Sequence, residues 1–187
     1  MYAIGIDYST TSPAICIHHG DSFSFSNCKF LVLNNTKKYY GCYLNSIYCK
    51  SVSEHPTKII RYSNIADEMI SFIKENIPNK ELVRIALEDY AFGAMGRVFH
   101  IAENCGLLKY KLWSQLNIIP DEISPTHIKK LATGKGSGKK DLIYQAFLEE
   151  TKIDLIQVLD YKKKEPGSPV SDLIDAYYIA KTAHNLQ

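Results

Sequence analysis

Three observations lead the sequence to predict an α/β fold. The chain contains both apolar runs of strand length and amphipathic runs of helix length. One helical run lies between two strand-like runs, as in a parallel crossover. A composition of 45% hydrophobic and 22% charged residues is typical of a globular protein rather than a disordered or fibrous one. Single domains commonly reach this length, so we expect residues 1–187 to form one domain with one core.

The N-terminal part of the chain predicts an antiparallel meander. Residues 2–7 form a strand-like run that ends in an acid, and residues 13–19 and 22–33 form two more. A turn at Gly20-Asp21 joins the second and third runs. Residues 34–57 lose the alternation and are rich in Lys, Tyr, Asn and Ser, so we interpret them as a surface insertion, either irregular or a long hairpin.

The central part predicts a strand between two helices. Residues 59–77 place apolar side chains at helical spacing and stop before a proline. Residues 82–87 form an apolar strand with Glu88 directly after it, and a helix over 98–116 leads into a strand-like pair at 118–119. Together with the meander these runs predict five strands.

The C-terminal part predicts helices. Short helices are expected over residues 128–132 and 141–150, with a loop of glycines and lysines between them. A polar linker over 160–169 then precedes a last helix, for which Ser171 is a suitable N-cap.

Four acids could act together. Asp7 and Glu88 each follow an apolar strand, so their carboxylates meet at one end of the sheet if the two strands are neighbours. Asp172 and Asp175 are three residues apart and share one face of the last helix. Four carboxylates suit Mg²⁺ or Mn²⁺ better than zinc. A structural role also remains open, because Asp7 can cap a turn and Asp172 can interact with the helix dipole.

Residues 125–140 contain five lysines and no acid, whereas the whole chain has a net charge of only +2. Such a cluster is typical of a phosphate-binding surface, and a solvated loop is the alternative. The glycines of this segment do not form a P-loop, because their spacing is one residue short and no Ser or Thr follows the lysines. The five lysines are Lys129, Lys130, Lys135, Lys139 and Lys140.

Four short segments resemble, in order and spacing, the four motifs of RuvC-type Holliday junction resolvases. They are Gly5–Asp7, Ala86–Glu88, the stretch Pro125–Lys140 and Ser171–Ala176. The resemblance covers most of the chain except residues 34–57, and it suggests a resolvase of the kind found in bacteriophages or other compact genomes.

The resemblance implies an RNase H-like fold with a mixed five-stranded sheet flanked by helices, and a homodimer. It also implies two Mg²⁺ ions per active site, for which Mn²⁺ is expected to substitute. By position, the metal ligands and catalytic acids are Asp7, Glu88, Asp172 and Asp175. Lys140, as a catalytic residue, and Lys129 match the family's basic positions near the scissile phosphate.

An aromatic residue often stands three positions after the second acid in this family, where it helps to open the junction. Here that position is Ala91, and the aromatic residues Tyr90 and Phe92 lie on either side of it. Either ring could stack on a base, and both could equally be packing residues.

The implied activity is Mg²⁺-dependent, paired and symmetric nicking of four-way DNA junctions that leaves ligatable 5′-phosphate ends. Three alternatives remain open: an endonuclease for forks, flaps, other branched DNA or RNA–DNA hybrids, a non-catalytic junction-binding protein, and an ATP-binding protein. The last follows from Gly5–Ser12, which resembles the first phosphate loop of sugar kinases and actin-like ATPases. Those proteins need two such domains, so we expect branched DNA as the partner and no nucleotide cofactor.

The cellular location is expected to be intracellular. The five cysteines are odd in number and form no CxxC pair, which favours a reducing compartment. We find no apolar run long enough for a membrane span and no secretion signal. The sequence therefore predicts a cytoplasmic protein without membrane contact, in the host cytoplasm if a phage encodes it.

Overall fold

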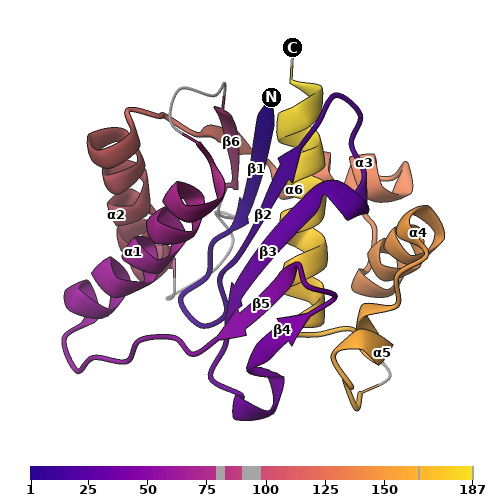
Figure 1. The fold of residues 1–187 in the computed structure, drawn as a ribbon, viewed down its shortest axis with the longest axis horizontal. Helices are drawn as coiled ribbons and strands as arrows, with labels where there is room; N and C mark the ends of the chain where they lie inside the picture. The colour runs from indigo at the N-terminus through magenta and orange to yellow at the C-terminus, as the bar shows by residue number, and fades with distance from the viewer. Residues whose placement is uncertain (79–82, 90–97, 164, 187) are drawn as a thin grey trace.

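The computed structural model describes residues 1–78, 83–89, 98–163 and 165–186, and a mixed seven-stranded sheet lies at its centre (Figure 1). The strands are β1 (Tyr2–Asp7), β2 (Ala14–His19), β3 (Cys28–Leu33), β4 (Gly41–Tyr43), β5 (Ile47–Lys50), β6 (Val83–Glu88) and β7 (Asp121–Ile123). Their order across the sheet is β4-β5-β3-β2-β1-β6-β7. The predicted mixed α/β sheet flanked by helices is therefore confirmed, with seven strands in place of five.

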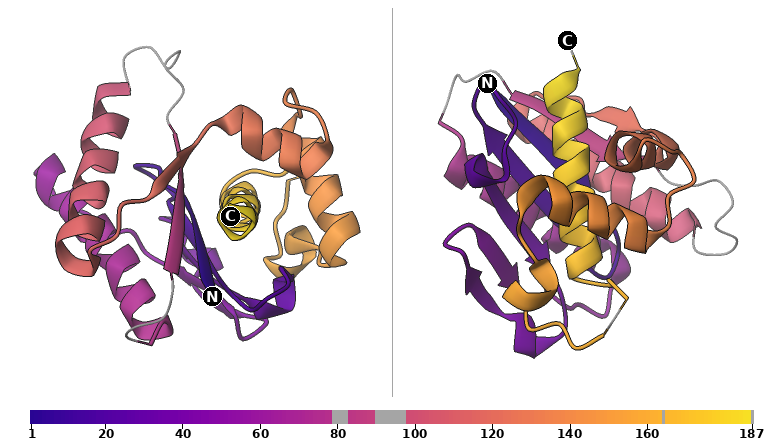
Figure 2. Two further views of the ribbon diagram at one scale, coloured as in Figure 1. Left: turned by 90° about the horizontal axis from the view of Figure 1, so that it is seen from above. Right: turned by 90° about the vertical axis from the view of Figure 1, so that its right-hand side faces the viewer.

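Helices cover both faces of the sheet (Figure 2). α1 and α2 pack on one face, and α6 packs on the other, with α3 and α4 on its outer side. The helices are α1 (Lys58–Asn76), α2 (Val98–Leu116), α3 (Pro125–Thr133), α4 (Lys140–Thr151), α5 (Leu155–Val158) and α6 (Val170–Asn185). In the part of the chain that the structure describes, none of them is long and apolar enough to cross a membrane.

Strand pairing places the first two acids side by side. β1 pairs antiparallel with β2 and parallel with β6, and Ile6 is the partner of Leu87. The carboxyl ends of β1 and β6 therefore lie at the same edge of the sheet. β6 and β7 are also parallel, with α2 between them, so the predicted crossover is confirmed.

Alternate side chains of β1 belong to two different cores. Ile4 and Ile6 are fully buried against α1 and α2, whereas Ala3 is buried on the side of α6. A β-carbon on Gly5 would lie 2.0 Å from Ala180 N and 2.4 Å from Ala176 O. α6 thus touches the backbone of β1 directly, and glycine is required at this position because any side chain would overlap the helix.

The segment 34–57 is not simply a surface insertion. It contains β4 and β5, and β5 pairs parallel with β3. Ile47 and Cys49 point into the α6-side core and are buried. In the turn of the hairpin, Leu44 and Asn45 have φ of 50° and 55°, the left-handed pair of a type I′ turn. A leucine does not indicate such a conformation.

The prediction of a strand at residues 118–119 is wrong. Asn117 adopts a left-handed conformation (φ 56°) after α2, and Ile118 N donates to Leu112 O, so this segment ends the helix instead of pairing. Ile119 is 80% exposed. The strand is the three-residue β7, which begins at Asp121.

Two further boundaries differ from the prediction. The third strand begins at Cys28 rather than residue 22, because a short 3₁₀ turn over Phe25–Asn27 packs Phe25 against Phe30 at a ring distance of 5.3 Å. The N-cap of α6 is Pro169, whereas Ser171 lies inside the first turn and donates its N–H to Gly167 O.

The Gly5→Ala variant is expected to lose roughly 3 kcal/mol of unfolding free energy, because the added methyl group meets backbone atoms that cannot rotate away. Urea denaturation measures this loss. Shrinking the side chain of the facing residue does not move its backbone, so Gly5→Ala with Ala180→Gly is expected to stay unstable. Recovery of wild-type stability in this double variant would contradict direct backbone contact.

Candidate active site

The structure brings the four predicted acids to one edge of the sheet. Asp7 and Glu88 are the last residues of β1 and β6, two neighbouring parallel strands. Asp172 lies in the first turn of α6 and Asp175 one turn later, on the helix that crosses β1. All four side chains are partly buried. These elements therefore bring the four acids to the same end of the sheet.

Burial and repulsion by neighbouring acids raise the pKa values of Asp7 and Asp175. The pKa of Asp7 lies well above its usual range, because of burial first and then the negative charges of Asp175, Asp172 and Glu88, with Lys140 acting in the opposite direction. The four groups thus act on one another electrostatically.

Asp175 shows the same effect. Burial, together with Glu88 and Asp172, raises its pKa to about 7 against the opposing charges of Lys140 and Lys129. Burial also raises the pKa of Glu88, and Lys129 opposes that shift. The site is therefore an acidic cluster with two lysines near enough to stabilise its charged form.

Asp172 is held by side chains that the sequence did not indicate as site residues. Ser12 Oγ and Ser168 Oγ both donate to its Oδ2, at 2.5 and 2.6 Å. The buried Asn34 donates from Nδ2 to both hydroxyl oxygens, at 3.3 and 3.1 Å. Three separate segments of the chain thus fix one carboxylate.

Only one of these three supporting residues has a sequence signal. Ser12 ends a run of hydroxyl residues, Ser9–Ser12, directly after the first acid. Ser168 and Asn34 lie 156 and 22 positions from Ser12 and stand in segments interpreted as a linker and an insertion.

The predicted lysine cluster lies on α3, α4 and the loop between them. Ser124 caps α3 by accepting from His127 N, and Gly134 ends it in a left-handed conformation at φ 74°. Lys140 begins α4 and lines a small pocket with Asp175. Of the five lysines, Lys129 and Lys140 are close enough to the acids to lower the pKa of at least one of them. The other three, Lys130, Lys135 and Lys139, are exposed on the same segment.

The two aromatic residues proposed to stack on bases, Tyr90 and Phe92, lie outside the described residues. The tyrosines of segment 34–57 are described, and several have contacts within the chain. Tyr39 stacks on Tyr161, and Tyr48 contacts Phe72 edge to face.

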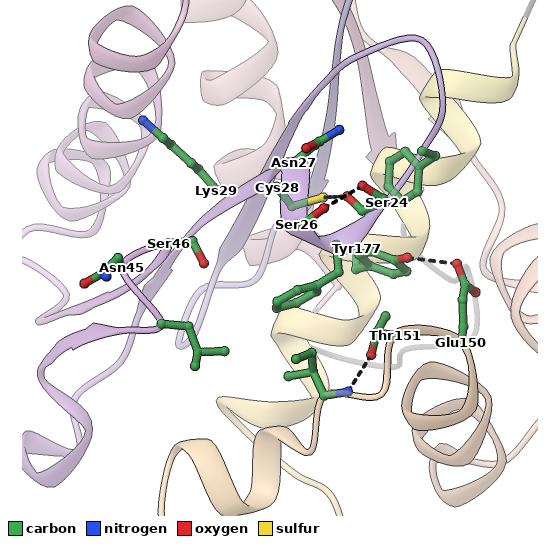
Figure 3. Close-up of a pocket in the computed structure, with 14 residues that line it drawn as sticks. Ser24, Ser26, Asn27, Cys28, Lys29, Asn45, Ser46, Glu150, Thr151 and Tyr177 are labelled. Carbon is green, nitrogen blue, oxygen red and sulfur yellow. Dashed lines mark hydrogen bonds between the residues drawn. The ribbon is translucent and has the colours of Figure 1, made fainter.

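A cavity of about 780 Å³ lies away from the acids, between the start of β3, the β4–β5 turn and the end of α4 (Figure 3). Its charged side chains are already paired within the chain. Glu150 accepts from Tyr177 at 2.8 Å and from Lys181 at 2.6 Å, and Lys29 donates to Asn76. We therefore place the candidate active site at the acidic cluster.

The donor set has the chemistry of a site for a hard divalent cation. All four groups are carboxylates, the negative charges of their neighbours raise the pKa of Asp7 and of Asp175, and a cation would relieve this repulsion. The side chains do not form a ready-made centre: within residues 1–78, 83–89, 98–163 and 165–186, no three His, Cys, Asp or Glu side chains are arranged to hold a metal ion. Metal binding would therefore require the carboxylates to move, including Asp172 with its two hydroxyl donors.

The fold is that of RuvC-type resolvases, as the sequence resemblance implied. RuvC of Thermus thermophilus in complex with a Holliday junction substrate superposes with a TM-score of 0.63 and 15% identity, over 97% of this chain and 92% of that one. A second T. thermophilus RuvC structure gives 0.59 and 17% over the same shares. The yeast mitochondrial Holliday junction resolvase Ydc2 gives 0.55 and 14%, over 97% of this chain and 76% of that one.

Comparison by sequence gives no relative. No model of a known protein family matches the chain, and no curated protein is significantly similar to it. The likeness to RuvC is therefore one of fold.

The Asp175→Asn variant is expected to be more stable than the wild type at pH 8 without divalent cations. The wild-type carboxyl has a pKa of about 7 in the folded state and 3.8 as its ordinary value, so its ionisation destabilises the fold as the pH rises between these values. The gain is up to about 4 kcal/mol above pH 7 and vanishes below pH 4. Urea denaturation at pH 4 and pH 8 measures it.

Asp21→Asn is the matched control, because Asp21 is an exposed acid in the β2–β3 connection and its loss is expected to change little. If Asp175→Asn were less stable than the wild type at pH 8, the prediction would be wrong, because other groups in the fold would then stabilise the ionised carboxylate.

Proposed function

We propose that this protein is a structure-selective endonuclease that resolves four-way DNA junctions by paired, Mg²⁺-dependent nicking. The observation that carries the proposal is the acidic cluster of Asp7, Glu88, Asp172 and Asp175 at the sheet edge of a RuvC-type fold, with Lys129 and Lys140 beside it. The junction bound in the T. thermophilus RuvC structure supports a branched DNA substrate.

The four carboxylates would hold Mg²⁺, which supplies an activated water and stabilises the leaving oxygen when bound. Ser12 and Ser168 would orient Asp172 for this role, because both already donate to its Oδ2. Lys140 and Lys129 would place positive charge beside the phosphate, where negative charge develops during in-line displacement. The products would carry 5′-phosphates that can be ligated.

The remaining proposed contacts hold the DNA. Lys130, Lys135 and Lys139 are exposed on the α3–α4 segment and would bind backbone phosphates. Tyr90 or Phe92 would stack on a base near the crossover.

A homodimer would pair two such sites. Large apolar side chains are exposed on α2, namely Phe99 (73%), Tyr110 (60%) and Trp113 (54%), and Ile59 of α1 is 56% exposed. Exposed apolar patches often mark interfaces. A two-fold axis here would relate two active sites, as symmetric nicking requires.

Wild-type protein with Mg²⁺ is expected to cut an end-labelled four-way junction with paired, symmetric nicks. Asp7→Asn, Glu88→Gln and Asp175→Asn are expected to abolish cutting while retaining junction binding, because losing negative charge does not weaken phosphate contacts. Lys140→Ala and Lys129→Ala are expected to slow cutting by about 10²-fold. Gel analysis of nicks and fluorescence anisotropy separate cleavage from binding.

Y-forks, flaps, RNA–DNA hybrids and linear duplex serve as competing substrates. Faster cutting of forks would keep the site and change the substrate. A wild type that binds junctions without cutting them would indicate a junction-binding protein. Full activity in the acid variants would show that the acidic cluster is not the active site.

The Trp113→Glu variant is expected to be monomeric and to lose paired nicking, because a buried charge is incompatible with an apolar interface. Sedimentation measures its mass, and a cruciform plasmid distinguishes paired from single nicks. Ile119→Glu is the matched control, since Ile119 is 80% exposed and lies outside α2. A Trp113→Glu protein that stays dimeric would exclude this surface.

A further inference from the structure

We infer that a pocket on the α1–α2 side of the loop after β1 binds a phosphate group of the substrate DNA, apart from the lysines of α3 and α4. The inference rests on the proposed function and adds a second phosphate subsite to it. The pocket has a volume of about 590 Å³. The residues that matter in its lining are Ser9, Thr10, Thr11, Lys58, Arg61 and His100.

The charge of the lining suits an anion. Lys58 contributes one positive charge, Arg61 contributes a second one that is paired with Glu54, and the described lining contains no acidic side chain. The nearby acids are already paired: Glu54 accepts from Arg61 Nε at 2.8 Å, and Glu103 lies 3.4 Å from His100 Nδ1.

Donors remain available for a ligand. The Lys58 ammonium lies 3.2 Å from His100 Nε2, and this contact uses one of its three protons. Within the described part of the chain, the hydroxyls of Thr10 and Thr11 make no hydrogen bond. A phosphate has several acceptor oxygens and could receive bonds from these groups at once.

The loop that forms one wall is held in place before any ligand arrives. Ser9 Oγ accepts from Ser12 N at 2.9 Å, and Arg61 Nη1 donates to Thr10 O at 2.7 Å. The buried Asn104 of α2 donates to Ser9 O at 3.4 Å. Such preorganisation lowers the entropy lost on binding.

The position of the pocket relates it to the acidic cluster. The loop begins directly after Asp7 and ends at Ser12, whose hydroxyl bonds to Asp172. α1 and α2 lie on one side of the sheet, and α3 and α4 on the other (Figure 2). A DNA strand that contacts both the pocket and Lys140 would therefore run past the acidic cluster, with one phosphate contact on each side of it.

A phosphate group could belong to the DNA backbone or to a free nucleotide. The loop sequence resembles that of ATP-binding proteins, but the same loop connects Asp7 to Ser12, which bonds to Asp172, in a RuvC-type fold. We therefore assign it to a phosphodiester of the DNA, and ATP serves as the competing probe.

The test measures junction affinity by fluorescence anisotropy at several KCl concentrations, in an Asp175→Asn background that does not cut. Lys58→Gln is expected to weaken binding about 3- to 10-fold near 0.1 M salt and to lower the salt slope by about one. Thr10→Val is expected to weaken binding without changing the slope. Sedimentation checks that each variant keeps the wild-type mass.

Lys74→Gln is the matched control, because Lys74 lies in the last turn of the same helix and pairs with Gln115 outside the pocket. If Lys58→Gln and Lys74→Gln lost junction affinity equally, the loss would be explained by the lower overall charge of the protein, and the inference would be overturned. Unchanged binding in Lys58→Gln would also overturn it, while cleavage by the wild type would leave the proposed function intact.

ATP is titrated by calorimetry in a separate arm. ATP binding that Lys58→Gln abolishes, with junction binding unchanged, would assign the pocket to a nucleotide and overturn the DNA inference. A wild type that binds no junction would instead overturn the proposed function, and the DNA inference with it.

Discussion

The backbone contact between α6 and β1 is the constraint on which the rest of the structure depends. It exists because Gly5 has no side chain where Ala176 and Ala180 cross the strand. α6 supplies two of the four acids and β1 supplies the third, so the same contact fixes the distance between them. A larger residue at the crossing would separate the carboxylates as well as destabilise the core.

Close approach of these elements also brings like charges together, and this opposes folding. The raised pKa values of Asp7 and Asp175 reflect that opposition. The middle of α6 compensates by burying Tyr177 and Tyr178, whose hydroxyls both donate to Glu150. Packing in the middle of α6 thus stabilises the helix that carries two of the acids, as is common where function requires unfavourable local chemistry.

The sequence predicts the parts of the site that local patterns specify. Asp7 and Glu88 are found because acids end apolar strands, and Asp175 because it interrupts an apolar helix face. Asn34 could not be found in this way, since its role depends on contacts with Ser12 and Ser168 that only the tertiary fold creates. The β4–β5 hairpin can be predicted only in part for a similar reason: Leu44 adopts a left-handed conformation that residue type alone does not indicate.

The β4–β5 hairpin also lowers the tendency of the protein to aggregate. Without β4 and β5, the apolar strand β3 would form the edge of the sheet and offer unpaired backbone groups to other molecules. With them, both edges of the sheet are strands of only three residues, β4 and β7. Short edges are poor templates for intermolecular strand addition, so this segment helps to keep the chain from self-association into fibrils, independently of any part it has in contacting DNA.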